Sequence, residues 1–319
     1  MKLKILSVFV LSVFILSACE AEGEEVSLSA IAPNGSPSLS QVPIEYDPSM
    51  VESMEYDMEV VAGADLLVSA FGSESHDLVF APLNVGANLY QTGVPYQLAA
   101  VVSFGNLFFA SAQSINSISD LDGEEIVVFG QNATPDIIVR SLIEQHSFEE
   151  TPEIRYVDSV DAAGGTLQSE PQSIVLMAEP ALSVQMSQID SDIHLIDLQD
   201  EWQSAFDTDG YPQAGVFVHE DVDDDALNIY LGALRASIDM VNSDPSSVAN
   251  DASALDYPFP APIIESALPR SNVRFETAHE ARASIESFFE EILALQADLI
   301  GGELPDDAFY RFTDFDDVE

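Results

Sequence analysis

Short apolar runs alternate along the chain with segments whose apolar residues recur at helical spacing. The apolar runs predict strands, and the helical spacing predicts helices between them. We expect strands at 26–32, 78–81, 97–103, 107–110, 125–129, 154–157, 173–177, 193–196 and, as the last strand, 214–218. Helices are expected at about 84–90, 135–144, 226–242 and 277–299. Strands that alternate with helices predict an α/β architecture with mostly parallel sheets.

The last of these helices has a start signal. Thr277 and Glu280 have the spacing of a capping box, in which each side chain bonds the other residue's backbone N–H. The apolar residues that follow at helical spacing favour a core-facing stripe over a docking surface.

The first 18 residues have the three parts of an export signal. Lys2 and Lys4 precede an apolar run over 5–16 that is too short to span a membrane, and small residues precede Cys19. The tetrapeptide Leu-Ser-Ala-Cys at 16–19 resembles a bacterial lipobox, which implies cleavage before Cys19, lipidation of its thiol, and a short tether over 19–24. The alternative is an ordinary secretory signal with a coincidental cysteine.

The charge of the chain is extreme. Removing the two lysines of the signal from the nine basic residues leaves seven arginines against 56 acids, a formal charge of −49. Such a chain repels nucleic acid and anionic lipid head groups. The excess of acid fits a saline or alkaline medium, or a composition bias of the lineage. With Cys19 as the single cysteine, the chain has no intrachain disulfide.

Six polar turns stand at the ends of the predicted strands, where ligands bind in open α/β sheets. They contain Asn34-Gly35-Ser36-Pro37, Pro82-Leu83-Asn84, Phe104-Gly105-Asn106, Gly130-Gln131-Asn132-Ala133-Thr134, Glu179-Pro180 and Tyr211-Pro212-Gln213. Amides, hydroxyls and free backbone N–H groups suit reversible binding of a small polar ligand. The alternative is that these residues only make turns.

Two of these features carry more specific expectations. Thr134 is a candidate N-cap with Pro135 at the first helical position, so that the helix N-terminus offers free N–H donors to a ligand. Arg270 lies between turn-forming residues and is either a counter-ion for a ligand or half of a structural salt bridge.

Enzyme signatures are poor. The chain has no G-x-S-x-G elbow and no phosphate-binding glycine loop, and its five histidines lack zinc spacing. The acidic run 219–225 lacks the spacing of a calcium loop and is expected to be a solvated surface. We expect no catalytic residue, no cofactor and no metal.

Five stretches in order carry a family resemblance: "IAPNGSPSL" at 31–39, "HDLVFAPLNVGANLY" at 76–90, "LDGEEIVVFGQNATPDII" at 121–138, "VLMAEPALS" at 175–183 and "YPQAGVFV" at 211–218. Together with the export signal, they resemble the type II periplasmic solute-binding lipoproteins of ABC importers, in the nitrate, sulfonate and thiamine-pyrimidine-precursor branch. The resemblance implies two α/β lobes joined by two crossing strands. Lobe one would comprise 25–106 and 216–319, and lobe two 107–215, with crossings near 106–111 and 212–216.

The resemblance also implies a function. The protein would be lipid-anchored on the extracytoplasmic face of the cell membrane, act as a monomer, and deliver a small ligand to an ABC permease and its ATPase. Two rival functions are an extracytoplasmic enzyme of the same fold acting on a pyrimidine-type compound, and a sensory lipoprotein without a transporter. The ligand contacts that the resemblance implies are Asn34, Gly35, Pro37, Pro82, Asn84, Gln131, Asn132, Ala133, Thr134 and Glu179. The polar turns, the aromatic residues and the scarce positive charge add Phe104, Gln213 and Arg270.

These contacts hold almost no positive charge. This scarcity disfavours an inorganic anion and leaves a neutral or cationic heteroaromatic ligand open. Phe104, Tyr46 and Tyr211 are candidates for stacking on such a ring, or for core and hinge roles.

Overall fold

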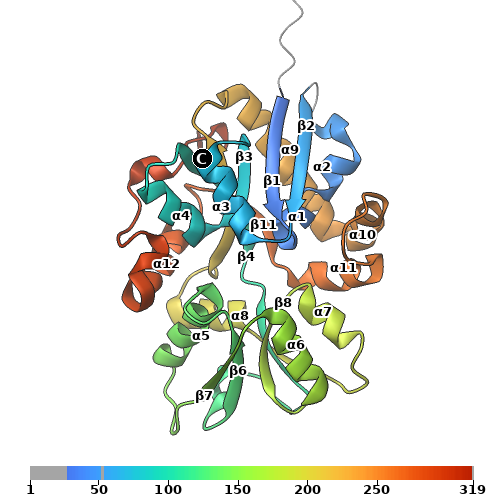
Figure 1. Ribbon diagram of the computed structural model, residues 1–319, viewed down its shortest axis with the longest axis vertical. Helices are drawn as coiled ribbons and strands as arrows, with labels where there is room; N and C mark the ends of the chain where they lie inside the picture. The colour runs from blue at the N-terminus through green and yellow to red at the C-terminus, as the bar shows by residue number, and fades with distance from the viewer. Residues whose placement is uncertain (1–26, 52–53, 318–319) are drawn as a thin grey trace, which may run out of the picture.

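Two β-sheets, each flanked by helices, form an upper and a lower lobe in the computed structural model (Figure 1). The structure describes residues 27–51 and 54–317. The expected signal peptide, Cys19 and the tether at 19–24 lie outside these residues. Among the described helices, none is both long and apolar enough to cross a membrane.

The sheet of the first lobe has six strands in the order β11-β4-β10-β3-β1-β2. They are β1 (Ser27–Pro33), β2 (Glu55–Val61), β3 (Leu78–Pro82), β4 (Tyr96–Phe104), β10 (Pro212–His219) and β11 (Val273–Thr277). The expectation that the last strand lies at 214–218 is wrong, because β11 follows it. Neither β2 nor β11 was expected from the apolar runs. These are the two edge strands of the first sheet, and neither contains the continuous apolar run by which the other strands were recognised, because charged residues alternate with the apolar ones.

The sheet of the second lobe has five strands in the order β7-β6-β8-β5-β9. They are β5 (Leu107–Ser111), β6 (Glu125–Phe129), β7 (Glu153–Val157), β8 (Ile174–Ala178) and β9 (His194–Asp197). Both sheets are mixed, so the expectation of mostly parallel sheets is wrong. β5 and β10 enter their sheets from the side of the other lobe, and they therefore run antiparallel to the strands that end there.

Helices cover both faces of each sheet, and those expected near 84–90, 135–144, 226–242 and 277–299 are among them. The first lobe holds α1 (Ser36–Leu39), α2 (Val42–Tyr46), α3 (Ala64–Ser73), α4 (Leu83–Gln91), α9 (Asp224–Ser243), α10 (Pro245–Ala254), α11 (Ala261–Ala267) and α12 (Arg282–Gln296). The second lobe holds α5 (Thr134–Gln145), α6 (Val160–Ser169), α7 (Ala181–Met186) and α8 (Leu198–Phe206). One buried apolar cluster joins the lobes, and in it Trp202 of α8 packs against Phe288 of α12.

The expected helix at 277–299 begins later than the sequence analysis predicted. Thr277 is the last residue of β11, and α12 starts at Arg282. The two capping-box bonds nevertheless form, with Glu280 Oε2 2.8 Å from Thr277 N and Thr277 Oγ1 3.1 Å from Glu280 N. They close the turn that leads into the helix.

The chain crosses between the lobes in two adjacent segments. The first runs from β4 through Gly105 to β5. The return reaches β10 through Tyr211, so that Pro212 already pairs with the first sheet and lies beyond the crossing. Gly105 N donates to Tyr211 O at 3.1 Å. Buried Gln199 accepts from both Gly105 N and Tyr211 N through its Oε1, each at 3.1 Å. One side chain therefore fixes both crossings.

Gly105 is the residue that allows the two crossings to touch. A Cβ at this position would overlap the ring of Tyr211. We expect Gly105→Ala to lower the free energy of unfolding by about 1–3 kcal/mol through overpacking, measured by urea denaturation. Gly165→Ala is the control, since a Cβ on that α6 residue meets no atom within 4 Å. It should raise stability by about 0.5–1 kcal/mol, and equal effects of the two changes would contradict this explanation.

Candidate functional site

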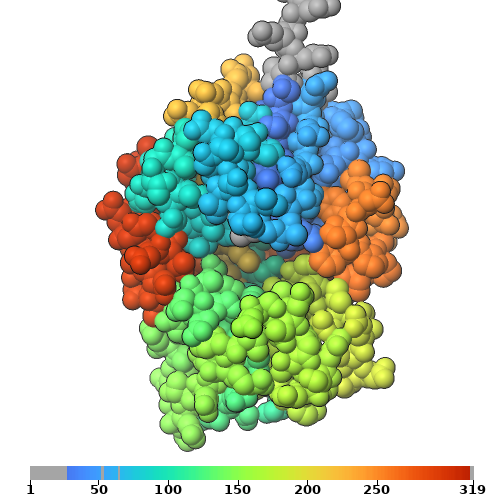
Figure 2. Space-filling view, viewed as in Figure 1, coloured from blue at the N-terminus to red at the C-terminus, as the bar shows by residue number. Residues whose placement is uncertain are grey.

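The polar turns of the two lobes face one another across the hollow that separates the lobes in Figure 2. The turns after β1 and β3 come from the first lobe, and those after β6 and β8 from the second. Thr134 Oγ1 donates to Asn84 Oδ1 at 3.2 Å, and Asn106 Nδ2 donates to Ser36 Oγ at 3.4 Å. Hydrogen bonds between predicted polar turns thus link the lobes directly.

The turn after β1 is held by its own serines. Gly35 has φ of 144°, which favours glycine, and Ser38 Oγ accepts from Gly35 N at 3.2 Å. Ser36 and Ser38 are buried, whereas Asn34 and Pro37 are half-buried. Asn34 also lines a crevice of about 470 Å³ together with Glu45 and residues 255–258, beside the turn.

The turn after β6 depends on an acid that the sequence analysis missed. Asp136 is 1% exposed, and its Oδ2 accepts from Asn132 N at 2.8 Å. This bond holds Asn132 in the left-handed region at φ of 59°. Tyr156 OH donates to Asp136 Oδ1 at 2.7 Å, and burial together with this bond raises the pKa of Tyr156 to about 12. A signal was available, since an acid in the first turn of a helix is favourable.

The expected N-cap at Thr134 is wrong. The N-cap is Ala133, which makes no side-chain capping bond, and Thr134 is the first helical residue. Thr134 is therefore free to bond Asn84 across the lobes. Gln131 and Asn132 are exposed at the rim of the turn, and Ala133 is half-buried.

Glu179 and Arg270 form an ion pair between the lobes. Arg270 Nε lies 2.6 Å from Glu179 Oε1, and the Glu179 side chain is fully buried. Ser183 completes the site, because its N and Oγ each donate to the carboxylate at 3.1 Å. Arg270 Nη2 donates to Ser183 Oγ at 2.8 Å. Both carboxylate oxygens therefore already accept bonds from protein groups.

Asn106 lies where the first crossing meets both lobes. It is 7% exposed, its N donates to Gln213 Oε1 at 3.3 Å, and its Nδ2 donates to Glu179 O at 3.1 Å. Its Oδ1 is buried and has no partner within the described part of the chain. A buried acceptor without a partner is costly, so Asn106 belongs with the candidate binding residues, although the sequence analysis named only its turn.

The aromatic candidates have different places. The guanidinium of Arg274 covers the ring of buried Phe104 at 3.6 Å from the centroid. Tyr211 is fully buried beside Trp202, whereas Tyr46 is 54% exposed. Pro82 is half-buried at the start of α4, next to Asn84. Of the three aromatic residues, Phe104 and Tyr211 thus pack at the crossing.

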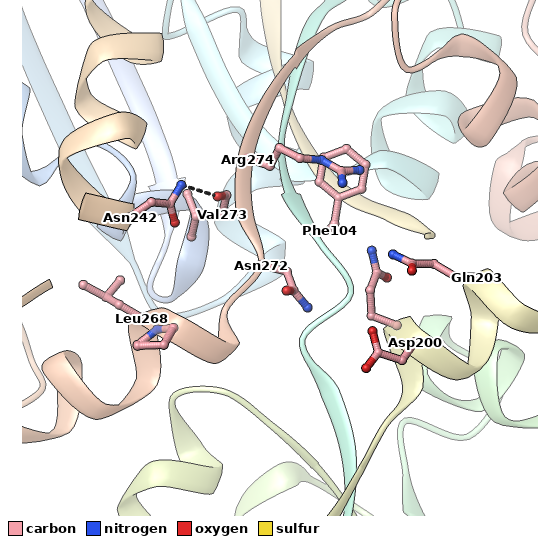
Figure 3. Close-up of a pocket in the computed structure, with 10 residues that line it drawn as sticks. Phe104, Asp200, Gln203, Asn242, Leu268, Asn272, Val273 and Arg274 are labelled. Carbon is pink, nitrogen blue, oxygen red and sulfur yellow. Dashed lines mark hydrogen bonds between the residues drawn. The ribbon is translucent and has the colours of Figure 1, made fainter. Parts of the chain in front are cut away.

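A cavity of about 280 Å³ lies beside the two crossing segments, at the β11–β4 edge of the first sheet (Figure 3). The turns after β1 and β3 lie nearer the other edge. The cavity takes its walls from both lobes. Its lining includes Phe104, Asp200, Gln203, Asn242, Asn272 and Arg274.

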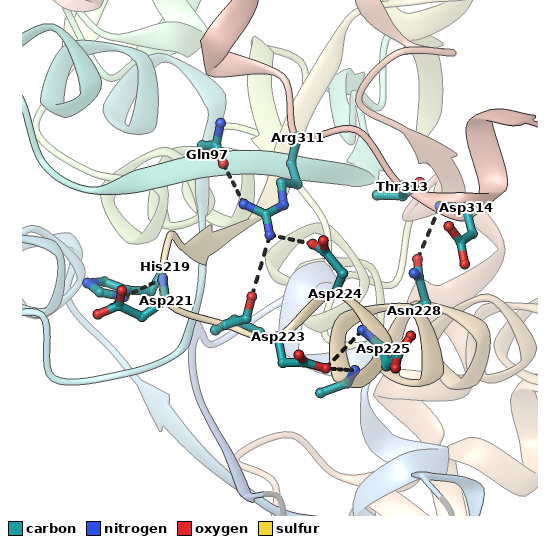
Figure 4. Close-up of polar contacts among 12 residues, drawn as sticks. Gln97, His219, Asp221, Asp223, Asp224, Asp225, Asn228, Arg311, Thr313 and Asp314 are labelled. Atoms are coloured by element: carbon teal, nitrogen blue, oxygen red, sulfur yellow. Dashed lines mark hydrogen bonds and ion pairs between the residues drawn. The ribbon is translucent and has the colours of Figure 1, made fainter.

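The acidic run at 219–225 serves local structure (Figure 4). Asp223 Oδ1 caps α9 by accepting from Asp225 N at 3.0 Å, and Asp224 Oδ1 lies 2.5 Å from Arg311 Nη2. Within the described residues, no three His, Cys, Asp or Glu side chains are grouped to hold a metal ion. The run caps a helix and tethers the C-terminal segment.

The architecture defines a class of protein, the two-lobed periplasmic-binding-protein fold, and solved structures of that class are similar to the chain. An ABC transporter protein from Parabacteroides distasonis is 19% identical with a TM-score of 0.80, over 90% of this chain and 99% of that one. The aliphatic sulphonate binding protein from Escherichia coli is 13% identical with a TM-score of 0.61, over 90% and 94%. The zinc-bound ligand-binding component of an import system from Staphylococcus aureus is 9% identical with a TM-score of 0.64, over 91% and 97%.

Sequence comparison then gives the family. The family model described as menaquinone biosynthesis matches residues 92–292, and the chain belongs to this family. No curated protein matches the chain. The expected two-lobed α/β fold is confirmed.

An acid beside the crossing gives the structure a pH dependence. Asp197 caps α8 by accepting from Gln199 N at 2.9 Å, and burial raises the pKa of Asp197 to about 6. The unfolded carboxyl titrates near 3.9. Its protonated form therefore stabilises the fold fully below about pH 4, and this contribution is lost as pH rises through 6.

We expect Asp197→Asn to be more stable than the wild type at pH 7.5 by about 1 kcal/mol, because an uncharged cap needs no ionised buried group. At pH 4.5 the two proteins should be nearly equal. Melting temperatures across this range test the prediction, and a difference that does not change with pH would contradict it.

Proposed function

We propose that the chain captures a small polar solute between its lobes and delivers it to an ABC permease driven by an ATPase. The observation that carries the proposal is the meeting of polar turns from both lobes at Asn84, Thr134, Asn106 and Ser36. The similar structures are described as an ABC transporter protein, a ligand-binding component of an import system and a sulphonate binding protein, which supports the proposal. Closure of two lobes on a solute is a recurring hinge motion.

The solute is neutral or cationic in this proposal. Each of the chain's seven arginines already contacts a carboxylate or an aromatic ring. Arg270, the arginine at the interlobe turns, is already paired with Glu179, and the formal net charge of −47 repels anions at a distance. Amide and hydroxyl groups from the turns instead suit a ligand that exchanges neutral hydrogen bonds.

The site in this proposal contains the residues named from the sequence except Phe104, Glu179 and Arg270, with Asn106 added. Phe104 is covered by Arg274 and lines the other cavity. Glu179 and Arg270 have a different role, as a pair that holds the lobes together. The protein would act as a monomer, tethered to the extracytoplasmic face through lipid on Cys19. The lobes would comprise about 27–105 with 212–317, and 106–211.

An enzymatic role is the second candidate, because the family is described by a biosynthetic pathway. In that case the same interlobe site would transform its ligand. Incubation of purified protein with the molecule that it carries, followed by mass analysis, separates the two functions. An unchanged ligand supports binding alone, and a product supports the enzyme.

The interlobe binding site is tested by measuring whether the purified protein retains a small molecule. Protein purified from its own host should retain a small molecule in native mass spectrometry. Asn84→Ala should reduce the occupied fraction at least fivefold, because it removes a buried amide at the lobe interface. Asn250→Ala is the control, since Asn250 bonds only Ser246 O of its own helix among the described contacts. Equal occupancy in both variants would place the ligand elsewhere.

The ion pair between the lobes is tested by separating its partners. Arg270→Gln leaves the buried Glu179 carboxylate without its counter-ion, which costs about 3–5 kcal/mol in comparable pairs. We expect a larger radius of gyration in small-angle scattering, and partial recovery when Glu179→Gln is added. Arg155→Gln removes an exposed pair within one lobe and should leave the radius unchanged. No difference between Arg270→Gln and Arg155→Gln would refute the role in closure.

A further inference from the structure

The cavity beside the crossing segments, at the β11–β4 edge, is lined mainly by hydrogen-bond acceptors of side-chain amides and one carboxylate (Figure 3). Four amide side chains line it. Gln199 turns its oxygen to the backbone of the two crossings, and the other three each donate an N–H to a backbone carbonyl. Asn242 Nδ2 donates to Val273 O at 2.9 Å, and Gln203 Nε2 donates to Asp209 O at 3.2 Å. Asn272 Nδ2 donates to Gly105 O. The amide oxygens of all three residues remain as the acceptors at this cavity.

The charge of the lining favours a cation. Asp200 contributes an exposed carboxylate from α8. The one guanidinium present, that of Arg274, stacks on Phe104 and lies 2.8 Å from the carboxylate of Glu276, so its charge is balanced. One uncompensated negative charge remains among three amide oxygens.

The size of the cavity limits its occupant. Pockets for drug-sized ligands hold about 300–1,000 Å³, so a cavity of about 280 Å³ takes a smaller molecule. Leu268, Pro269 and Val273 add apolar surface for a short hydrocarbon chain.

We propose that this hinge cavity is a second ligand site, which binds a small organic cation rich in N–H donors, such as an alkylguanidinium or alkylammonium ion. Asp200 bonds the cationic group, and the oxygens of Gln203, Asn242 and Asn272 accept its remaining N–H donors. The site is separate from the interlobe turns, since it lies at the β11–β4 edge of the first sheet.

Binding here also couples to the angle between the lobes. Asp200 and Gln203 belong to α8 of the second lobe, whereas Asn242, Asn272 and Arg274 belong to the first. An occupant that contacts both walls binds more tightly to one lobe angle than to others, and by linkage it shifts the closure equilibrium. This coupling rests on the proposed function, but the binding itself does not.

The experiment compares two probes of nearly the same shape. 1-Butylguanidinium chloride is titrated into the full-length protein at constant ionic strength, with neutral 1-butylurea as the isostere. Backbone amide shifts in ¹H–¹⁵N spectra give the affinity and the location. We expect butylguanidinium to bind at least fivefold more tightly than butylurea, with shifts concentrated on α8, Asn242 and 272–274.

Matched variants separate this site from the acidic surface. Asp200→Asn should weaken butylguanidinium at least fivefold, and Gln203→Leu should weaken it through the lost oxygen. Asp190→Asn makes the same charge change at an exposed position in the second lobe and should leave the affinity unchanged. Equal binding of butylurea, an equal loss in Asp190→Asn, or shifts spread over the acidic surface would each overturn the proposal.

The coupling between the hinge cavity and the lobe angle can be followed by tryptophan fluorescence. Trp202 is the single tryptophan, lies on α8 next to Gln203, and packs against Phe288 of the other lobe. Its fluorescence should change as butylguanidinium saturates the wild type and should not change in Asp200→Asn at the same concentration. Binding without a fluorescence change would leave the site intact and refute the coupling. The proposed interlobe solute site is refuted by a separate result, which is that no small molecule accompanies the purified protein.

Discussion

The structure depends on the contact between the two crossing segments at Gln199. One buried amide oxygen accepts the backbone N–H groups of Gly105 and Tyr211, so that the two connections between the lobes are tied at one point. A glycine is needed there because the ring of Tyr211 fills the space that a side chain would take. The mixed sheets follow from the same constraint, since β5 and β10 must start at the crossing and run away from it.

Positive charge is scarce in this chain, and this scarcity limits which side chains can recognise a ligand. With seven arginines available after the two lysines near the N-terminus, each guanidinium has a structural task. Arg270 joins the lobes, Arg311 ties the C-terminal segment to α9, and Arg274 covers Phe104 at the crossing. Recognition is therefore left to amides and hydroxyls at the interlobe turns, and to amide oxygens with one carboxylate at the hinge cavity. Both arrangements suit ligands that are neutral or positively charged.

The sites could be located from the sequence more easily than their chemistry. Strand-end turns were visible as polar breaks after apolar runs, and the structure brings those after β1, β3, β6 and β8 together. The residue that shapes one of these turns, Asp136, was not named, although an acid in the first turn of a helix was a local signal. Its bond to Tyr156 of β7, 20 positions away, forms only in the folded chain. Asn106 was likewise passed over, since only folding buries its side chain between the lobes.

The sequence by itself determined the alternation of strands and helices and the acidic character, because these follow from local apolar spacing and composition. The two-lobed class was implied by the family resemblance of five stretches of the sequence. The edge strands β2 and β11 of the first sheet were not predicted, since their apolar residues alternate with charged ones and form no continuous run. Only the tertiary structure decided that Arg270 meets Glu179 and that Thr134 bonds Asn84 and does not cap its helix. The hinge cavity was also decided there, because its walls come from α8, α9 and β11, which approach one another only when the two lobes are joined.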